Sequence, residues 1–238
     1  MRLASVSLVI PVRDELDTVM SGLLTVRTMG WAFRPRRWEV IVVDDGSVVP
    51  FPDATIRHPV SLGYGAALKA GIARATGEWI VTADGDGQHR WKDVLRLVEF
   101  MEDFPETEMV IGDRRLRETS VKRFLGRKAL NWLASMFAGR WIPDLNGGLR
   151  VFRRKVAVGY FPILCDQFSF TTSLTLSMLT DGYKVDWLPV LVHPRSHGQS
   201  QVKVWRDGWR TLCLIVWIGM ALRTREVRRV WRHLHGRP

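Results

Sequence analysis

The strongest constraint on how this chain folds is an alternation of two patterns between residues 5 and 112. Short β-branched apolar runs, suited to strands buried on both faces, occur at residues 5–12, 38–43, 78–83 and 108–112. Between them, apolar residues recur at helical spacing at about residues 16–29, 67–75 and 91–103. Because strands alternate with helices, the pattern predicts an α/β fold with a mostly parallel sheet and right-handed crossovers.

The alternation loosens after Gly112. The later elements that the sequence indicates are a basic amphipathic stretch at 122–138, the run GGLRVFRR at 147–154, a helix near 169–180 and a strand at 184–192. The chain of 238 residues is long enough to bury a full core. We expect one domain at 1–202, followed at 203–238 by amphipathic basic helices.

Positive charge is concentrated in the second half of the chain. The net charge is +11; residues 113–154 hold eleven Lys or Arg against three Asp or Glu, and residues 203–238 hold nine against two. The rest of the chain is therefore acidic on balance. An anionic partner is expected to meet the basic half, and charge alone leaves nucleic acid, anionic lipid and a phosphorylated substrate open.

The segment 211–222 is apolar nearly all round, but it is shorter than the roughly 20 residues that a bilayer span requires. Tryptophans flank it or lie within it, at Trp205, Trp209 and Trp217, and five arginines follow it, at Arg223, Arg225, Arg228, Arg229 and Arg232. This combination favours a helix that lies in the membrane interface. The alternative is a core helix followed by a solvated basic tail.

Two further features bear on location. Cys165 and Cys213 lie in apolar contexts, which indicates buried thiols in a reducing compartment. The first residues have the pattern of a strand rather than of a signal peptide. We therefore expect a cytoplasmic protein, held peripherally at the cytoplasmic face of a membrane.

Acidic side chains follow three of the predicted strands. They are Asp14 and Glu15, then Asp44 and Asp45, then Asp84 and Asp86 with Gln88. Ligands of an open parallel sheet bind beyond the carboxyl ends of its strands, where gathered carboxylates repel one another unless a cation joins them. Carboxylate and amide oxygens suit Mg²⁺ or Mn²⁺ bound together with substrate phosphates. The stretch VTADGDGQHR is therefore better interpreted as a metal–diphosphate clamp than as an acidic turn, which its Asp and Gly content also allows.

A dinucleotide-binding turn is a competing interpretation of SLGYGAALKAG. Gly63 and Gly65 open a helix, and Asp84 lies at about the distance of a ribose-binding acid. However, Pro59 breaks the segment where a core strand is required, and the bulky Leu68 fills the third glycine position. A nucleic-acid-binding protein is a less favoured alternative, because it gives the acidic edge no purpose.

Four motifs, VIPVRDE, VVDDGS, GYGAALKAG and ADGDGQHR, resemble in this order those of the inverting family-2 glycosyltransferases with the glycosyltransferase-A fold. Within that family the chain looks most like the polyprenyl-phosphate sugar synthases, such as the dolichyl-phosphate mannose synthases. The resemblance covers roughly residues 5–200. It implies a mostly parallel, Rossmann-like sheet flanked by helices. It also implies metal-dependent transfer of mannose or glucose from a GDP- or UDP-sugar to a polyprenyl phosphate.

The resemblance also implies roles for individual residues. The nucleotide-sugar pocket would be lined by Pro11, Arg13, Glu15, Asp45, Lys69 and Asp84. Mg²⁺ or Mn²⁺ and the diphosphate would be held by Asp84, Asp86 and Gln88. The acceptor phosphate would be contacted by Arg114, Arg127, Arg195 and Ser200. The catalytic residues would be Asp86, Arg114 and Arg127, and a further family motif is matched by Asp144, Gly148 and Arg150.

Some positions depart from the family pattern. Arg13 stands where the family usually has Asn, the sequence Trp187-Leu188-Pro189 replaces Glu-Val-Pro, and Gln201 replaces a Lys. The departures bear on the sugar and the acceptor, so a soluble family-2 enzyme that acts on a saccharide or small-molecule acceptor is the alternative function. His197 is interpreted as a solvated loop residue, with a third metal ligand as the alternative. The implied reaction is a single in-line displacement, in which an already ionised phosphate attacks the anomeric carbon and needs no strong general base.

Overall fold

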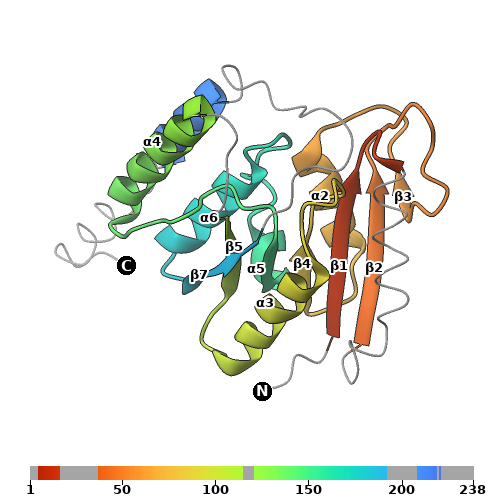
Figure 1. Ribbon diagram of the computed structural model, residues 1–238, viewed down its shortest axis with the longest axis horizontal. Coiled ribbons are helices and arrows are strands. Elements are labelled where there is room, and N and C mark those ends of the chain that lie inside the picture. Colours follow the sequence, from red (N-terminus) through yellow and green to blue (C-terminus); the bar gives the residue numbers. More distant parts are fainter. Residues whose placement is uncertain (1–4, 17–36, 115–120, 192–207, 219, 221–238) are drawn as a thin grey trace, which may run out of the picture.

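The computed structural model describes residues 5–16, 37–114, 121–191, 208–218 and 220. Its strands are β1 (Ser5–Val12), β2 (Arg37–Asp44), β3 (Ile56–Arg57), β4 (Trp79–Thr82), β5 (Met109–Arg114), β6 (Arg150–Arg153) and β7 (Val185–Val190). Its helices are α2 (Tyr64–Arg74), α3 (Trp91–Asp103), α4 (Val121–Ala138), α5 (Arg154–Gly159), α6 (Phe170–Thr180) and a helix at residues 208–218 (Figure 1).

The strands form one seven-stranded sheet in the order β3-β2-β1-β4-β6-β5-β7. Strand β1 pairs in parallel with β2 and β4, and β5 pairs in parallel with β7. Only β6, among the described strands, runs antiparallel to its neighbours β4 and β5. The prediction of a mostly parallel α/β sheet flanked by helices is confirmed.

Helices cover both faces of the sheet, and alternate residues of β1 show how. Val6, Leu8 and Ile10 pack in the cluster that includes the apolar face of α3. Val9 points to the opposite face and packs in the cluster formed with α2, α5 and α6. Both faces of β1 are therefore buried, which is why its sequence is a continuous apolar run rather than an alternating one.

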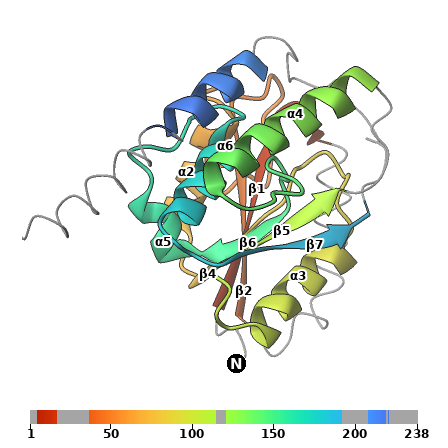
Figure 2. The ribbon, with the colours of Figure 1, turned by 90° about the vertical axis from the view of Figure 1, so that its left-hand side faces the viewer.

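A third cluster lies outside α6, where α4 and the 208–218 helix pack. Ala134 of α4, Leu176 of α6, and Ile215 and Ile218 of the 208–218 helix share it. Figure 2 shows α3 on one side of β5, β6 and β7, and on the other side α6 with α4 and the 208–218 helix beyond it. The basic, tryptophan-bearing helices thus form an outer layer at one end of the molecule.

The 208–218 helix combines the two alternatives considered for the apolar segment. Ile215 is fully buried, whereas Trp209 is 67% exposed and Trp217 is 57% exposed. One face therefore belongs to the core and another faces outward. Among the described helices, none has both the length and the apolar character needed to cross a bilayer.

Several expectations need correction or fall outside the described residues. Cys213 is exposed and Cys165 is half-buried, so the expectation of two buried thiols is wrong. Cys213 is exposed because one face of the 208–218 helix packs in the core and the other does not. The apolar sequence of this helix does not reveal which face packs. The strand expected at 184–192 ends at Val190. The helix expected at 16–29 lies almost entirely outside the described residues, as does the domain boundary at 202.

We predict that Ile215→Ala lowers the free energy of unfolding by about 2–5 kcal/mol, because it leaves a cavity between α4 and α6. Denaturant unfolding of both proteins measures the change. The matched control is Cys213→Ala, an exposed substitution on the same helix that should change stability by less than about 0.5 kcal/mol. Equal stability of Ile215→Ala and wild type would place this helix outside the core.

Candidate functional site

The predicted site residues meet at one edge of the sheet because of the strand directions. β2, β1 and β4 are parallel neighbours, so the residues that follow them lie at the same edge. Because β6 is antiparallel to β4 and β5, it begins at the edge where those strands end. Arg114 at the end of β5 and Arg150 at the start of β6 therefore join the three acidic loops, and the expectation of a shared acidic edge is confirmed.

The loops after β1 and β2 are linked by Asp14. This residue adopts φ 55°. Its backbone N–H donates to Ser47 Oγ at 3.0 Å, and its Oδ1 accepts from the Val48 N–H at 2.9 Å. The neighbouring Arg13 donates to Ser61 Oγ at 2.9 Å, which connects the first loop to the segment that leads into α2.

Asp45 is almost fully buried and accepts four hydrogen bonds from that same segment. The partners are His58 Nδ1 at 2.7 Å, Ser61 Oγ at 2.8 Å, and the backbone N–H groups of Leu62 and Gly63, each at 2.9 Å. Burial alone would raise the pKa of Asp45, but these hydrogen bonds outweigh it and lower the pKa. Asp45 thus shapes the turn before α2, and its contact with a nucleotide remains a prediction.

The other residues predicted for the nucleotide pocket occupy different settings. Pro11 is buried in β1, and Glu15 is half-buried after it. Lys69 of α2 donates to the Leu164 carbonyl at 2.6 Å and to Asp166 Oδ1 at 2.7 Å. These contacts fix α2 to the loop before α6. Arg195, His197 and Ser200 lie outside the described residues.

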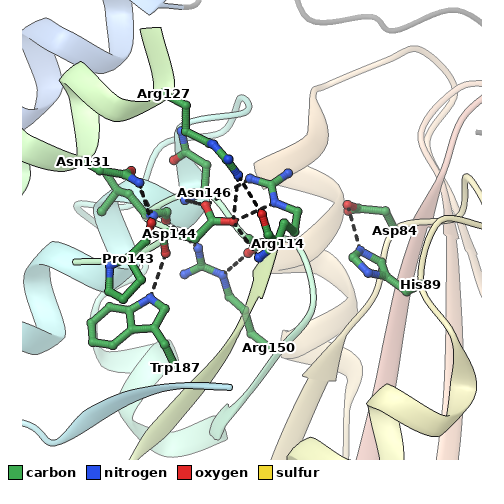
Figure 3. Close-up of polar contacts among 12 residues, drawn as sticks. Asp84, His89, Arg114, Arg127, Asn131, Pro143, Asp144, Asn146, Arg150 and Trp187 are labelled. Carbon is green, nitrogen blue, oxygen red and sulfur yellow. Dashed lines mark hydrogen bonds and ion pairs between the residues drawn. The ribbon is translucent and has the colours of Figure 1, made fainter. Parts of the chain in front are cut away.

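Asp84 is held by side chains from two other parts of the edge. Tyr64 donates its hydroxyl to Oδ1 at 2.7 Å. His89 Nε2 lies 3.3 Å from Oδ2, as Figure 3 shows. Burial would raise the pKa of Asp84, but the bond and charge of His89, the bond from Tyr64 and the charge of Arg114 lower it to about 2. Burial and the Asp84 charge raise the pKa of Tyr64 well above its usual value. Asp84 is therefore a carboxylate and Tyr64 a neutral donor at neutral pH.

The backbone before β6 closes over Asp84. A Cβ atom at Gly148 would overlap Oδ2 of Asp84, so only glycine allows this approach. The Gly148 carbonyl accepts a hydrogen bond from Thr82 Oγ1 of β4 at 2.7 Å, which fixes the segment in place. Gly148 matches a glycine of the family motif, and its close contact with Asp84 explains why this position is a glycine.

Asp86 and Gln88 complete that loop. Asp86 is almost fully buried and accepts the Gln88 backbone N–H at 3.1 Å, across Gly87 with φ 72°. Within the described part of the chain, no group of three or more His, Cys, Asp or Glu side chains has the arrangement of a complete metal site. A Mg²⁺ or Mn²⁺ site completed by substrate phosphates needs only one or two carboxylates, so the Asp86 carboxylate and the Gln88 amide fit such an ion. Asp84, the third predicted ligand, accepts hydrogen bonds from Tyr64 and His89, and its role at the metal remains a prediction.

The basic side of the edge is built around the buried carboxylate of Asp144. Arg114 contacts it in bidentate fashion, with Nε 2.7 Å from Oδ2 and Nη2 3.0 Å from Oδ1 (Figure 3). Nη1 of Arg127, on α4, lies 3.7 Å from Oδ2 of Asp144 and donates to the Arg114 carbonyl at 3.2 Å. Burial would raise the pKa of Asp144, but the charge and hydrogen bonds of Arg114 and the charge of Arg127 lower it. The two arginines predicted at the acceptor phosphate are therefore brought together.

Arg150 holds the loop that contains Asp144. Its side chain is fully buried and donates to the carbonyls of Gly147, Leu145 and Thr171 and to Thr175 Oγ1. Burial lowers its pKa to about 10, so it remains charged at neutral pH. Arg150 is thus a fixed positive charge that organises the loop before β6.

Three residues of the site were not singled out from the sequence: Tyr64, His89 and Thr175. Tyr64 lies in the motif GYGAALKAG and His89 in ADGDGQHR. Their place in these motifs is the sequence signal that could have identified them. Thr175 lies in FTTSLTLSMLT, where Thr171 and Thr175 stand one helical turn apart and residues 170–178 are buried. A buried run with regularly spaced hydroxyls indicates a polar partner, which here is Arg150.

Residues 7–161 match the family described as Glycosyl transferase family 2. This is more than half of the chain. The chain therefore belongs to glycosyl transferase family 2, a family of glycosyltransferase enzymes.

Two curated relatives carry names with more detail. The dodecaprenyl-phosphate galacturonate synthase of Rhizobium johnstonii is 29% identical over 84% of this chain and 62% of its own length. The undecaprenyl-phosphate 4-deoxy-4-formamido-L-arabinose transferase of Klebsiella pneumoniae is 29% identical over 84% of this chain and 63% of its own length. The chain thus spans less than two thirds of the length of these relatives.

Solved structures confirm the fold. Glucosyl-3-phosphoglycerate synthase from Mycobacterium tuberculosis, crystallised with Mn²⁺, uridine-diphosphate and phosphoglyceric acid, superposes with a TM-score of 0.70 at 16% identity. The match covers 91% of this chain and 78% of that chain. The glycosyltransferase-A fold expected from the sequence is therefore confirmed.

We predict that Asp144→Asn lowers the free energy of unfolding by about 3–5 kcal/mol at neutral pH, because two arginines lose their buried counter-ion. The pKa of Asp144 is lower in the folded than in the unfolded state, so its contribution is present above the unfolded pKa and is lost as the pH falls through the folded value. Denaturant unfolding between neutral and acid pH should show the difference shrinking with acidity. Asp181→Asn, at an exposed carboxylate bonded to the Tyr160 hydroxyl, is the control and should cost little. A constant difference at every pH would argue against an ionised Asp144.

Proposed function

We propose that this protein catalyses inverting transfer of a sugar from a nucleotide-sugar to a polyprenyl phosphate. The observation that carries the proposal is the pairing of Arg114 and Arg127 around Asp144, at the same sheet edge as the Asp84–Gln88 loop. One edge thus offers a cation-binding loop for a diphosphate and a preorganised arginine pair for a second phosphate. The names of the two curated relatives, both polyprenyl-phosphate transferases or synthases, support the same acceptor class.

The donor side of the proposal assigns the nucleotide-sugar to the loops after β1, β2 and β4. Asp86 and Gln88 would hold Mg²⁺ or Mn²⁺, which when bound supplies charge stabilisation for the departing diphosphate. The Mn²⁺ in the structural neighbour supports a divalent ion. Tyr64 and His89 hold Asp84 ionised and in a fixed orientation, so the donor meets an arrangement that does not have to reorganise.

The acceptor side rests on the arginines. A phosphate oxygen of the acceptor forms the new bond to the anomeric carbon, while the bond from that carbon to the diphosphate breaks and the electron pair leaves with the diphosphate. No proton has to be removed from the nucleophile, because the phosphate is already ionised. Arg114 and Arg127 orient it through N–H groups whose positions Asp144 fixes.

One finer point of the proposal is a mannose or glucose donor, which the family resemblance supports. Another is peripheral attachment at the cytoplasmic face of a membrane, which the resemblance and the basic, tryptophan-bearing helices support. A second candidate is a family-2 enzyme with a small phosphorylated acceptor. It is favoured by one observation, the phosphoglyceric acid in the structural neighbour. An arginine pair suits both acceptors, so assays on a prenyl phosphate and on phosphoglyceric acid separate them.

We predict that Asp86→Ala reduces turnover at least about a hundredfold, since loss of a metal ligand removes several kcal/mol of charge stabilisation. Metal-dependent nucleotide binding, measured by calorimetry with and without Mn²⁺, should disappear while the melting temperature remains close to wild type. Asp103→Ala, at the exposed end of α3, is the control. Near-normal turnover of Asp86→Ala in excess EDTA would remove the metal clamp from the proposal.

We predict that Arg127→Ala lowers kcat/KM by about tenfold to a hundredfold on both a long-chain and a short, water-soluble prenyl phosphate. The reason is the loss of a charge-assisted hydrogen bond, worth about 1.5–3 kcal/mol. Nucleotide affinity should not change. Lys128→Ala, the exposed neighbour on α4, keeps the helix and serves as the control. Full activity of Arg127→Ala on the short acceptor would exclude the phosphate contact and favour a saccharide acceptor.

A further inference from the structure

The loop from Asp144 to Gly148 joins the two halves of the site. At one end, the Asp144 carboxylate holds Arg114 and Arg127. At the other end, Gly148 lies so close to Asp84 that a Cβ atom there would overlap its carboxylate. Under the proposed function, the diphosphate lies at the acidic loop and the acceptor phosphate at the arginines. The sugar that passes from one to the other is then expected to lie beside this loop.

Asn146 is the residue of this loop that can offer a side chain to a ligand. Leu145 is fully buried and packs in the cluster that α4 shares with the 208–218 helix. Gly147 and Gly148 have no side chain. Asn146, in contrast, is only half-buried. Within residues 145–148, a functional group can therefore extend from the loop at position 146 alone.

Two hydrogen bonds hold Asn146 in one orientation, and Figure 3 shows the residue beside Asp144. Its backbone N–H donates to Asp144 Oδ1 at 3.1 Å. Its side-chain Oδ1 accepts from the hydroxyl of Thr172, on α6, at 2.6 Å, and Thr172 is itself fully buried. No hydrogen-bond partner for the amide nitrogen of Asn146 lies among the described residues. The carbonyl end of the amide is thus fixed, while its two N–H donors stay available.

The backbone on both sides of Asn146 is also fixed, through Arg150. The buried guanidinium donates to the carbonyls of Leu145 and Gly147, which flank Asn146. It also donates to Thr175 Oγ1 of α6 at 2.7 Å. The loop is therefore tied to a packed helix, and the amide cannot turn freely toward a different ligand. A fixed donor discriminates among ligands, because it is left unpaired when the matching acceptor is missing.

The chemistry of the amide suits a sugar. Its N–H groups are neutral donors, whereas the phosphates on either side have the cation-binding loop and the arginines as partners. We propose that Asn146 is a specificity-determining residue, whose amide donates a hydrogen bond to a hydroxyl oxygen of the sugar being transferred. The inference rests on the proposed function. It deepens that function by naming a residue that recognises the sugar rather than the nucleotide or the acceptor.

Calorimetry on the full chain with Mn²⁺ tests the proposal with four probes: UDP, UDP-glucose, GDP and GDP-mannose. Asn146→Ala should bind the sugar nucleotide that wild type prefers about threefold to tenfold more weakly, because one neutral hydrogen bond is lost. Its affinity for the matching nucleoside diphosphate, which carries no sugar, should not change. An equal loss for both probes would indicate a displaced loop and overturn the proposal.

The remaining outcomes separate this inference from the proposed function. If Asn146→Ala binds the sugar nucleotide as tightly as wild type, the sugar contact is wrong while the proposed reaction stands. If wild type binds none of the four probes, the proposed donor is wrong and the inference falls with it.

Donors that lack single hydroxyl groups give a second readout, with kcat/KM measured on a short, water-soluble prenyl phosphate. Wild type should lose about threefold to tenfold in kcat/KM with the deoxy donor that lacks the contacted hydroxyl, and Asn146→Ala should not distinguish that donor from its parent. Thr172→Val, which keeps the amide but removes its anchor, should weaken this discrimination. The matched control is Thr180→Val on the same helix, where the hydroxyl bonds only to carbonyls of α6. It should discriminate like wild type. Equal discrimination by Asn146→Ala and wild type across the deoxy series would overturn the proposal.

Discussion

The site depends on one buried carboxylate. Asp144 is excluded from water, and a charge in that position is stable only if opposite charges and donors surround it. Arg114 satisfies it in bidentate fashion and Arg127 approaches from α4. This requirement brings together the end of β5, the helix α4 and the loop before β6, which the chain supplies at separate points. The two arginines are thus ordered in the folded protein, so a phosphate that they bound would not have to order them.

The acidic half follows a related principle on a smaller scale. Asp45 accepts hydrogen bonds from His58 and Ser61, which follow it in the sequence. Asp84 accepts them from Tyr64, which precedes it, and from His89, which follows it. Each carboxylate fixes a turn and remains ionised. Asp86 also holds a turn, because it accepts the Gln88 backbone N–H. The proposed function assigns the cation to this last turn of the acidic edge.

Much of the fold could be predicted from sequence because its signals are local. The continuous apolar run at 5–12 requires a strand buried on both faces, and the helical spacing at 91–103 requires one packed face. The antiparallel direction of β6 could not be predicted, since a four-residue strand carries no sign of its direction. The Tyr64–Asp84 contact spans 20 residues and the Arg114–Asp144 contact spans 30. Both depend on where helices and loops pack, so the motifs identified the participants but not their pairing. The exposure of Cys213 was missed for the same reason.

The antiparallel strand β6 also fixes a distance within the sheet. β6 lies between β4 and β5, so the end of β4, which leads into the acidic loop, and the end of β5, which carries Arg114, stand two strand spacings apart, about 10 Å. Gly147 and Gly148 pack closely between these strand ends. A Cβ atom at Gly147 would meet the Gly112 carbonyl oxygen, and one at Gly148 would meet the Asp84 carboxylate, so neither position has room for a side chain. The separation between the ends of β4 and β5 is therefore a property of the hydrogen-bonded ladder and not of side-chain rotamers. Substitutions that change side chains at either end of the ladder therefore leave the distance between these two strand ends unaltered.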